Sequence, residues 1–170
     1  RKKGYGLDYP AEAVLPLIRS AEAVAFVANH EGPITKRGKR SERCPPAKNW
    51  NYRSRLRNRE ALTRVGFTHL SMANNHALDR CWEGLEETLG HFDDLGIVAF
   101  GAGGNIDEAR APAVIEVGET RVAIAGGMEA WEQYRDATPP WNASSDRGGL
   151  AFLNKAGIPA LLRAARAEAD

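Results

Sequence analysis

Two short polar segments carry residue types that can do chemistry. The first, ANHEGPIT at residues 28–35, contains Glu31, and the second, MANNHALD at residues 72–79, contains Asn75 and His76. Each follows an apolar run that is typical of a buried strand. Carboxylate, amide and imidazole groups form a mixed oxygen and nitrogen ligand set that suits Mg²⁺, Mn²⁺ or Zn²⁺. A metal ion held there would polarise a phosphoryl or ester oxygen and activate a bound water.

A plain structural interpretation stays open for each of these residues. Asn74 and Asn75 can form a turn, because asparagine tolerates left-handed backbone geometry. Asp79 can cap the helix that follows. His76 is suited to proton transfer, since an unperturbed imidazole has a pKa of about 6.5, but it can also be a partly buried structural histidine. The sequence contains neither HxH nor HExxH spacing, so spacing alone does not identify a metal site.

The other histidines are expected to be structural. His30 neighbours Glu31, but alternation along a strand points it the other way, so it is left out of the ligand set. His69 lies inside an expected strand and His91 inside an expected helix.

Helices and strands alternate along the chain, which predicts parallel strands joined by crossover helices. Helices are expected at residues 9–22, 54–66, 82–96, 106–111 and 158–169, and strands at residues 23–29, 67–73 and 97–100. Residues 113–117 and 121–126 flank a short polar turn and predict an antiparallel hairpin. The expected fold is therefore α/β, with a mixed, largely parallel sheet and flanking helices. In such sheets functional groups collect beyond the carboxyl ends of the strands, where both polar segments would open into one crevice.

Two further segments favour structural interpretations. GAGGN at residues 101–105 lies where a phosphate-binding loop could form, but it lacks the GxGxxG frame, so a tight strand-to-helix connection is favoured. Residues 127–149 are expected to form an irregular packed loop. The alternative is a cover over the crevice, with Trp131, Tyr134 and Trp141 as its walls.

The charges are unevenly distributed, although the net charge is +1. Residues 1–60 carry 14 Lys and Arg against 6 Asp and Glu, whereas residues 61–170 carry 9 against 16. The basic residues are densest in residues 35–60, where an anionic polymer could bind or where a solvated loop could lie. The candidate anion-binding side chains are Arg53, Arg55 and Arg57, with Trp50 and Tyr52 among them. Nucleic acid is not expected, because no known binding motif accompanies these charges.

Length and composition fit one folded domain. The chain has 170 residues, of which 43% are apolar and 26% charged, and no apolar run is long enough for a membrane-spanning helix. Cys44 and Cys81 lack a CxxC spacing; two unpaired thiols are expected, and a disulfide is left open for an oxidising compartment. The chain opens at Arg1 and stops within a helical pattern, so we expect residues 1–170 to be a single incomplete domain of a longer protein.

Three motifs in this order resemble one family. They are Asn-x-Glu-Gly-Pro after one strand, Ala-Asn-Asn-His-x-x-Asp after the next, and Gly-x-Gly-x-Asn after the third. Over residues 9–126 the chain is similar to bacterial poly-γ-glutamate capsule-synthesis (CapA-like) proteins. The fold of that family is similar to calcineurin-type metallophosphoesterases, so the resemblance implies that this chain is part of a metallophosphoesterase-like sandwich.

The resemblance also implies roles for the polar residues. Glu31 would be the acidic metal ligand, Asn75 the metal-binding asparagine, and His76 a general acid or a donor to a phosphate oxygen. Asn74 and Asp79 would orient the turn. The implied function is a metal-dependent hydrolase acting on a phosphoester, or a non-catalytic binder of an anionic capsule polymer.

The resemblance implies the bacterial cell envelope as the location and leaves membrane anchoring of a longer protein open. The chain departs from the family at His30, where a leucine is usual. The family's opening Gly-Asp motif and its later histidine motif fall outside residues 1–170, so this chain would supply the middle of the site.

Overall fold

The computed structural model describes residues 6, 9, 11–38 and 48–170. Its central sheet consists of three parallel strands in the order β1 (Val27–Asn29), β2 (His69–Ser71) and β3 (Val98–Phe100). In register, Asn29 lies beside Ser71, and Ser71 lies beside Phe100. The predicted α/β fold with parallel strands is therefore confirmed.

The remaining strands of the described part form separate two-stranded sheets. Two are antiparallel, β4 (Ala102–Gly103) with β8 (Gly149–Leu150) and β5 (Ala113–Val117) with β6 (Thr120–Ile124). A third is parallel and joins β7 (Met128–Glu129) to β9 (Phe152–Leu153). The hairpin of β5 and β6 is the one that the sequence predicts.

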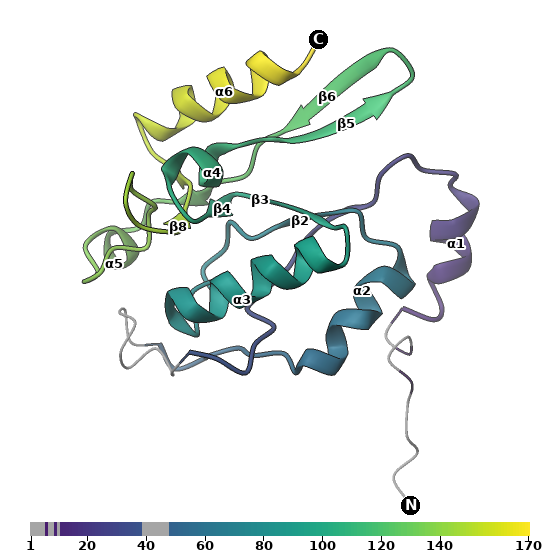
Figure 1. Ribbon diagram of the computed structural model, residues 1–170, viewed down its shortest axis with the longest axis horizontal. Coiled ribbons are helices and arrows are strands. Elements are labelled where there is room, and N and C mark those ends of the chain that lie inside the picture. The colour runs from purple at the N-terminus through teal and green to yellow at the C-terminus, as the bar shows by residue number, and fades with distance from the viewer. Residues whose placement is uncertain (1–5, 7–8, 10, 39–47) are drawn as a thin grey trace, which may run out of the picture.

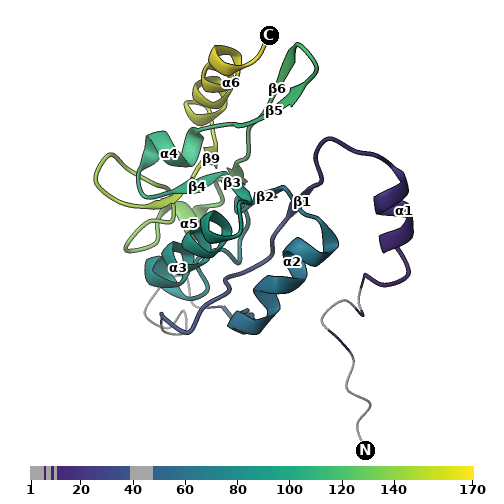
Figure 2. The same cartoon turned by 45° about the vertical axis from the view of Figure 1, so that its right-hand side comes forward.

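The helices lie around these sheets. They are α1 (Leu15–Ser20), the 3₁₀ helix η2 (Leu56–Asn58), α2 (Arg59–Val65), α3 (Cys81–Asp94), α4 (Ile106–Arg110), α5 (Glu132–Arg135) and α6 (Gly157–Glu168). Helix α3 lies against the central sheet, and α6 lies beside the hairpin at the other end of the molecule (Figures 1 and 2). Within the described residues no helix is long and apolar enough to span a membrane.

Helix α3 forms where the sequence predicts a helix, because its apolar side chains share one face. Leu85 and Phe92 on that face are fully buried and pack in one core with Leu70 of β2. Burying each such side chain contributes about 1.5–3 kcal/mol. The helix ends before Gly96, whose φ of 67° is a left-handed conformation that favours glycine.

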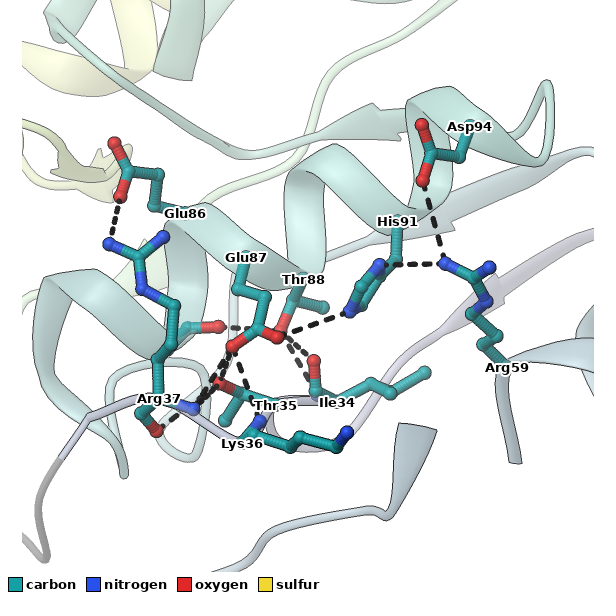
Figure 3. Close-up of polar contacts among 11 residues, drawn as sticks. Ile34, Thr35, Lys36, Arg37, Arg59, Glu86, Glu87, Thr88, His91 and Asp94 are labelled. Atoms are coloured by element: carbon teal, nitrogen blue, oxygen red, sulfur yellow. Dashed lines mark hydrogen bonds and ion pairs between the residues drawn. The ribbon is translucent and has the colours of Figure 1, made fainter. Parts of the chain in front are cut away.

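Hydrogen bonds on both sides hold the chain that follows β1. On one side the Thr88 hydroxyl of α3 accepts the Ile34 N–H at 3.0 Å and donates to the Gly84 carbonyl at 2.7 Å (Figure 3). On the other side the Ser54 N–H donates to the Pro33 carbonyl at 2.8 Å. The segment that carries Glu31 is therefore tied to the core and to the chain before α2.

Glu87 of α3 holds the next residues of the same segment. Its Oε2 accepts the Lys36 N–H at 3.2 Å, the Arg37 N–H at 3.0 Å and the Thr35 hydroxyl (Figure 3). Burial acts to raise the pKa of Glu87, but the hydrogen bonds from Thr35, Arg37 and Lys36 and the charge of His91 together outweigh it, so the pKa is lowered. The carboxylate therefore stays ionised and serves as an anchor for three donors.

Several predicted elements differ from the observed ones. The strands are three residues long rather than seven at β1 and β2, and the helix expected at 54–66 begins as the 3₁₀ helix η2. Residues 102–103 of the GAGGN segment form strand β4, so this segment is more than a connection. Cys81 is disulfide-bonded, so the expectation of unpaired thiols is wrong for it. Cys44 lies outside the described residues.

Candidate functional site

The two polar segments leave the sheet side by side. Strands β1 and β2 are parallel neighbours that end in register, at Asn29 and Ser71. The first residue past β1, His30, donates its N–H to the Ser71 carbonyl at 3.0 Å. The ends of parallel neighbours lie at one edge of the sheet, so the segments beyond them share one location.

The buried side chain of Asn74 joins the two segments. Its Nδ2 donates to Asn29 Oδ1 at 3.0 Å and to the His30 carbonyl at 2.9 Å. Its Oδ1 accepts the N–H of His76 at 3.0 Å. One amide group therefore connects the end of β1 to the turn that carries His76 and closes that turn.

Asp79 holds the ring of His76. Asp79 Oδ2 lies 2.7 Å from His76 Nδ1 and also accepts the Tyr52 N–H at 2.6 Å. An ionised carboxylate only accepts, so Nδ1 is the donor, and in the neutral imidazole Nε2 keeps its lone pair. Asp79 is fully buried and does not cap α3, whose N-cap residue is Arg80.

The free nitrogen of His76 lies near Glu31. His76 Nε2 is 3.9 Å from Glu31 Oε1, while Glu31 Oε2 accepts a hydrogen bond from Asn29 Nδ2 at 2.6 Å. Two ligand atoms that each lie about 2.1 Å from one metal ion are at most about 4.2 Å apart. The separation therefore lets both side chains reach the same cation.

Asn75, which is expected to bind the metal together with Glu31, is half-buried in the turn. Among the described residues its side chain has no hydrogen-bond partner, which leaves the amide oxygen available. No group of three or more His, Cys, Asp or Glu side chains that could hold a metal occurs in the described part of the chain. The donors at this corner are thus one carboxylate, one imidazole and one amide, which fit a divalent ion only together with further ligands.

Lys48 and Tyr52 also lie beside His76. Both belong to the basic stretch at residues 35–60, in which the sequence alone does not distinguish the role of one residue from that of another. Lys48 Nζ forms an ion pair with Asp79, donates to the Asn75 carbonyl and lies 3.3 Å from His76 Nδ1. The Tyr52 ring stacks on the His76 ring at 3.9 Å and 15°. Neither contact with His76 has a sequence signal. Lys48, for example, is one of many basic residues in this stretch.

The segment around Trp141 also reaches the site. Trp141 is buried and packs on Tyr134 with ring centroids 4.7 Å apart, and Lys48 Nζ lies 5.2 Å from the Trp141 ring centroid. Trp131 is 51% exposed. The packed-loop interpretation thus describes Tyr134 and Trp141 but not Trp131.

His30 faces the core, as strand alternation predicts. Its ring meets the Phe92 ring edge-on at 5.1 Å. Burial lowers the pKa of His30 to about 4, and a hydrogen bond with the Gly32 backbone acts in the opposite direction. His30 is therefore neutral at physiological pH and belongs to the packing under α3.

The three candidate anion-binding arginines, Arg53, Arg55 and Arg57, are exposed. Their guanidinium groups form no ion pair with any residue that the structure describes. Arg59, two residues further on, differs, since it contacts His91 Nδ1 at 3.1 Å and Asp94 at 3.5 Å on α3 (Figure 3). Positive charge is therefore exposed at these three positions.

Comparison with known proteins adds independent information. Residues 1–170 match the family model described as bacterial capsule synthesis protein PGA_cap. A probable polyglutamine synthesis accessory protein of Mycobacterium tuberculosis is 33% identical over 142 residues, which cover 84% of this chain and 36% of that protein.

Two Bacillus proteins are also similar. The capsule biosynthesis protein CapA of Bacillus anthracis is 28% identical over 75% of this chain and 30% of its own length. The PGA biosynthesis protein CapA of Bacillus subtilis is 31% identical over 62% of this chain and 26% of its own length. The aligned part of the chain thus covers 36%, 30% and 26% of the length of these three relatives.

Proposed function

The chain belongs to the bacterial capsule synthesis protein PGA_cap family, and on that premise we propose that Glu31, Asn75 and His76 form part of a divalent-metal site of phosphoesterase type. The names of two relatives refer to capsule or PGA biosynthesis, which supports a role in making a poly-γ-glutamate capsule. The protein that carries this chain would act there on a phosphoester or a related bond.

One observation carries this proposal. His76 Nε2 lies 3.9 Å from Glu31 Oε1, while the other ring nitrogen is held by the buried Asp79. A histidine fixed in this way presents one defined nitrogen to a carboxylate, which is how metal-binding and proton-transferring histidines are oriented.

The residues have separate roles in the proposed site. Glu31 and Asn75 would hold Mn²⁺, Mg²⁺ or Zn²⁺ through oxygen atoms, and a bound ion would polarise the substrate and supply an activated water. His76 would not bind the ion itself, and its Nε2 would exchange a proton with a substrate oxygen. Asp79 would hold the ring through Nδ1, and Asn74 would keep the two segments together.

Mn²⁺-dependent phosphoesterase activity of the full-length protein tests this proposal. His76→Ala should lower kcat by about 100-fold or more, the usual contribution of a positioned acid or base. Glu31→Gln should weaken Mn²⁺ binding, measured by calorimetry, whereas Glu119→Gln in the exposed turn of the hairpin should not. Equal Mn²⁺ affinity in the Glu31 and Glu119 variants would rule out the metal site.

A second function is favoured by the exposed arginines. Arg53, Arg55 and Arg57 lie on the segment that also supplies Tyr52 to the site. Free guanidinium groups attract carboxylates, so the chain could bind an anionic capsule polymer without turning it over. Polymer binding without any phosphoesterase activity would support this alternative.

A further inference from the structure

We propose that Lys48 is a positioning residue for the candidate site formed by Glu31, Asn75 and His76. It neutralises the buried carboxylate of Asp79 and holds the Asn75 carbonyl, so that the turn presents Asn75 and His76 toward Glu31. This inference rests on the metal site proposed above. It concerns a residue that no motif in the sequence singles out.

Asp79 is the residue whose charge Lys48 neutralises. This side chain is fully buried and accepts the Tyr52 N–H at 2.6 Å and the His76 Nδ1–H at 2.7 Å. An ionised carboxylate in such a place is strongly disfavoured unless a cation accompanies it. Lys48, whose side chain is 12% exposed, forms the ion pair that supplies this cation.

The Lys48 ammonium group is enclosed by its partners. It contacts the Asp79 carboxylate and the Asn75 carbonyl, and it lies 5.2 Å from the centroid of the buried Trp141 ring. An ammonium group has three N–H donors and a positive charge, so it can pair with the carboxylate, donate to the carbonyl and lie near an aromatic ring at the same time. Burial lowers the pKa of Lys48, while the hydrogen bond and charge of Asp79 act to raise it.

Lys48 acts on the turn that carries Asn75 and His76. Asn75 and His76 are adjacent, and Lys48 holds the backbone of the first while it approaches Nδ1 of the second within 3.3 Å. Because Nδ1 already donates to Asp79, Lys48 acts on the ring through Asp79 and not by a hydrogen bond of its own. Loss of Lys48 would thus leave Asp79 without its cation and release the Asn75 backbone.

Loss of Lys48 would change the geometry of the metal ligands but would not remove a ligand. Partners that orient metal ligands without touching the metal typically change metal affinity by about 10-fold to 100-fold when they are removed. Lys48→Met, which keeps the length of the side chain and removes its charge, should therefore weaken Mn²⁺ binding by about this factor. Lys48→Arg keeps the charge and should recover most of the affinity.

The experiment uses the full-length protein and two measurements. Calorimetry gives the Mn²⁺ affinity of Lys48→Met, Lys48→Arg, Glu31→Gln and the control Lys36→Met, whose lysine is exposed. Nitrogen-15 NMR of the labelled, metal-free protein follows the ring nitrogens of His76, which should shift in Lys48→Met and stay near the wild-type values in Lys48→Arg. If Lys48→Met acted only by destabilising the fold, Lys48→Arg would not restore both the Mn²⁺ affinity and the His76 ring signals. Lys48→Gln replaces the Met variant if the latter does not fold.

The outcomes separate this inference from the proposed function. If Glu31→Gln weakens Mn²⁺ binding and Lys48→Met binds like the wild type, the role of Lys48 is wrong and the metal site stands. If Glu31→Gln has no effect, the metal site is wrong, and the NMR measurement decides on Lys48. Ring nitrogens of His76 that are unchanged in Lys48→Met would then overturn the positioning role, and shifted ones would support it.

Discussion

At the scale of single residues, the imidazole of His76 is held by Asp79 and Tyr52 and faces Glu31. Asp79 holds Nδ1, Tyr52 covers one ring face at 3.9 Å, and Nε2 lies 3.9 Å from Glu31. Aromatic stacking of this kind contributes about 0.5–1.5 kcal/mol beyond the buried area. The ring is therefore fixed in orientation before any ligand arrives, which a site with a defined proton donor or metal ligand requires.

Gly32 makes the stack of Tyr52 on His76 possible. Its φ of 88° is left-handed, and a Cβ at this position would lie 2.9 Å from the Cβ of Tyr52. Gly32→Ala should lower the free energy of unfolding by about 1–2 kcal/mol, because it adds backbone strain and displaces Tyr52. Urea denaturation measures the loss, and Gly90→Ala on α3, where a Cβ meets nothing within 4 Å, is the control.

The same variant should loosen the imidazole. In Gly32→Ala the NMR signals of the His76 ring should move toward those of Tyr52→Ala, since the first variant displaces the stacked ring and the second removes it. A Gly32→Ala protein with wild-type stability and wild-type His76 signals would show that the close approach of Tyr52 is unimportant.

His30 predicts a pH dependence of stability. Its pKa in the folded protein is lowered to about 4 from 6.5, mainly by burial, so the unfolded chain binds a proton at a higher pH than the folded one. The folded state is then favoured above pH 6.5 and loses this advantage as the pH falls toward 4. The shift corresponds to at most about 3 kcal/mol.

The variant His30→Leu, which introduces an apolar side chain beside Phe92, isolates this effect. Urea denaturation between pH 7 and pH 4, with a chelator present, should show a shallower loss of stability in the variant than in the wild type. Other groups titrate equally in both proteins, so the difference between the two curves reports on His30. Parallel curves would contradict the assignment of a buried neutral imidazole.

At the scale of elements, α3 positions the segment that carries Glu31. The Thr88 hydroxyl accepts the Ile34 N–H at 3.0 Å in a fully buried place (Figure 3). Thr88→Val keeps the shape of the side chain but leaves this N–H without a partner, which costs about 1–3 kcal/mol. Thr63→Val on the exposed face of α2 should change the free energy of unfolding by about 0.5 kcal/mol or less. Equal effects in urea denaturation would show that Thr88 is not an anchor.

The elements that the sequence predicts well are those with their own periodic pattern. The apolar stripe with Leu85 and Phe92 identifies α3, and the alternating runs around Gly118 identify the hairpin of β5 and β6. Strands β4 and β8 have no such pattern, because each has two residues, too few for a period. Their pairing is decided by contacts distant in sequence, which propensity does not contain.

The candidate site likewise contains contacts that the sequence predicts and contacts that it does not. Residue types and strand ends predict that Glu31 and His76 meet, because parallel neighbours end at one edge of the sheet. Lys48 could not be predicted, since its contact with Asp79 depends on how a long irregular segment folds back over the turn. The expected roles of Glu31, Asn75 and His76 stay predictions until a metal ion is measured.

At the scale of the whole molecule, the uneven charge predicts where an anionic polymer binds. Residues 1–60 are strongly basic, whereas residues 61–170 are acidic, so a polyanion should approach from the side of the exposed arginines at 53, 55 and 57. If the chain binds polyglutamate there, the affinity should fall steeply between 50 mM and 300 mM salt, conditions we choose because screening grows over this range.

A matched pair of triple variants tests the location. Replacing Arg53, Arg55 and Arg57 with alanine should weaken polyglutamate binding by about tenfold or more, as expected for three exposed charge contacts. The control removes the same charge elsewhere, at the exposed Arg19, Arg163 and Arg166, and should keep most of the affinity. Equal losses in fluorescence titrations would mean that only net charge matters, and a binding surface beside Tyr52 would then be excluded. A loss confined to the first variant, together with a weaker salt dependence, would place the polymer next to the His76 corner.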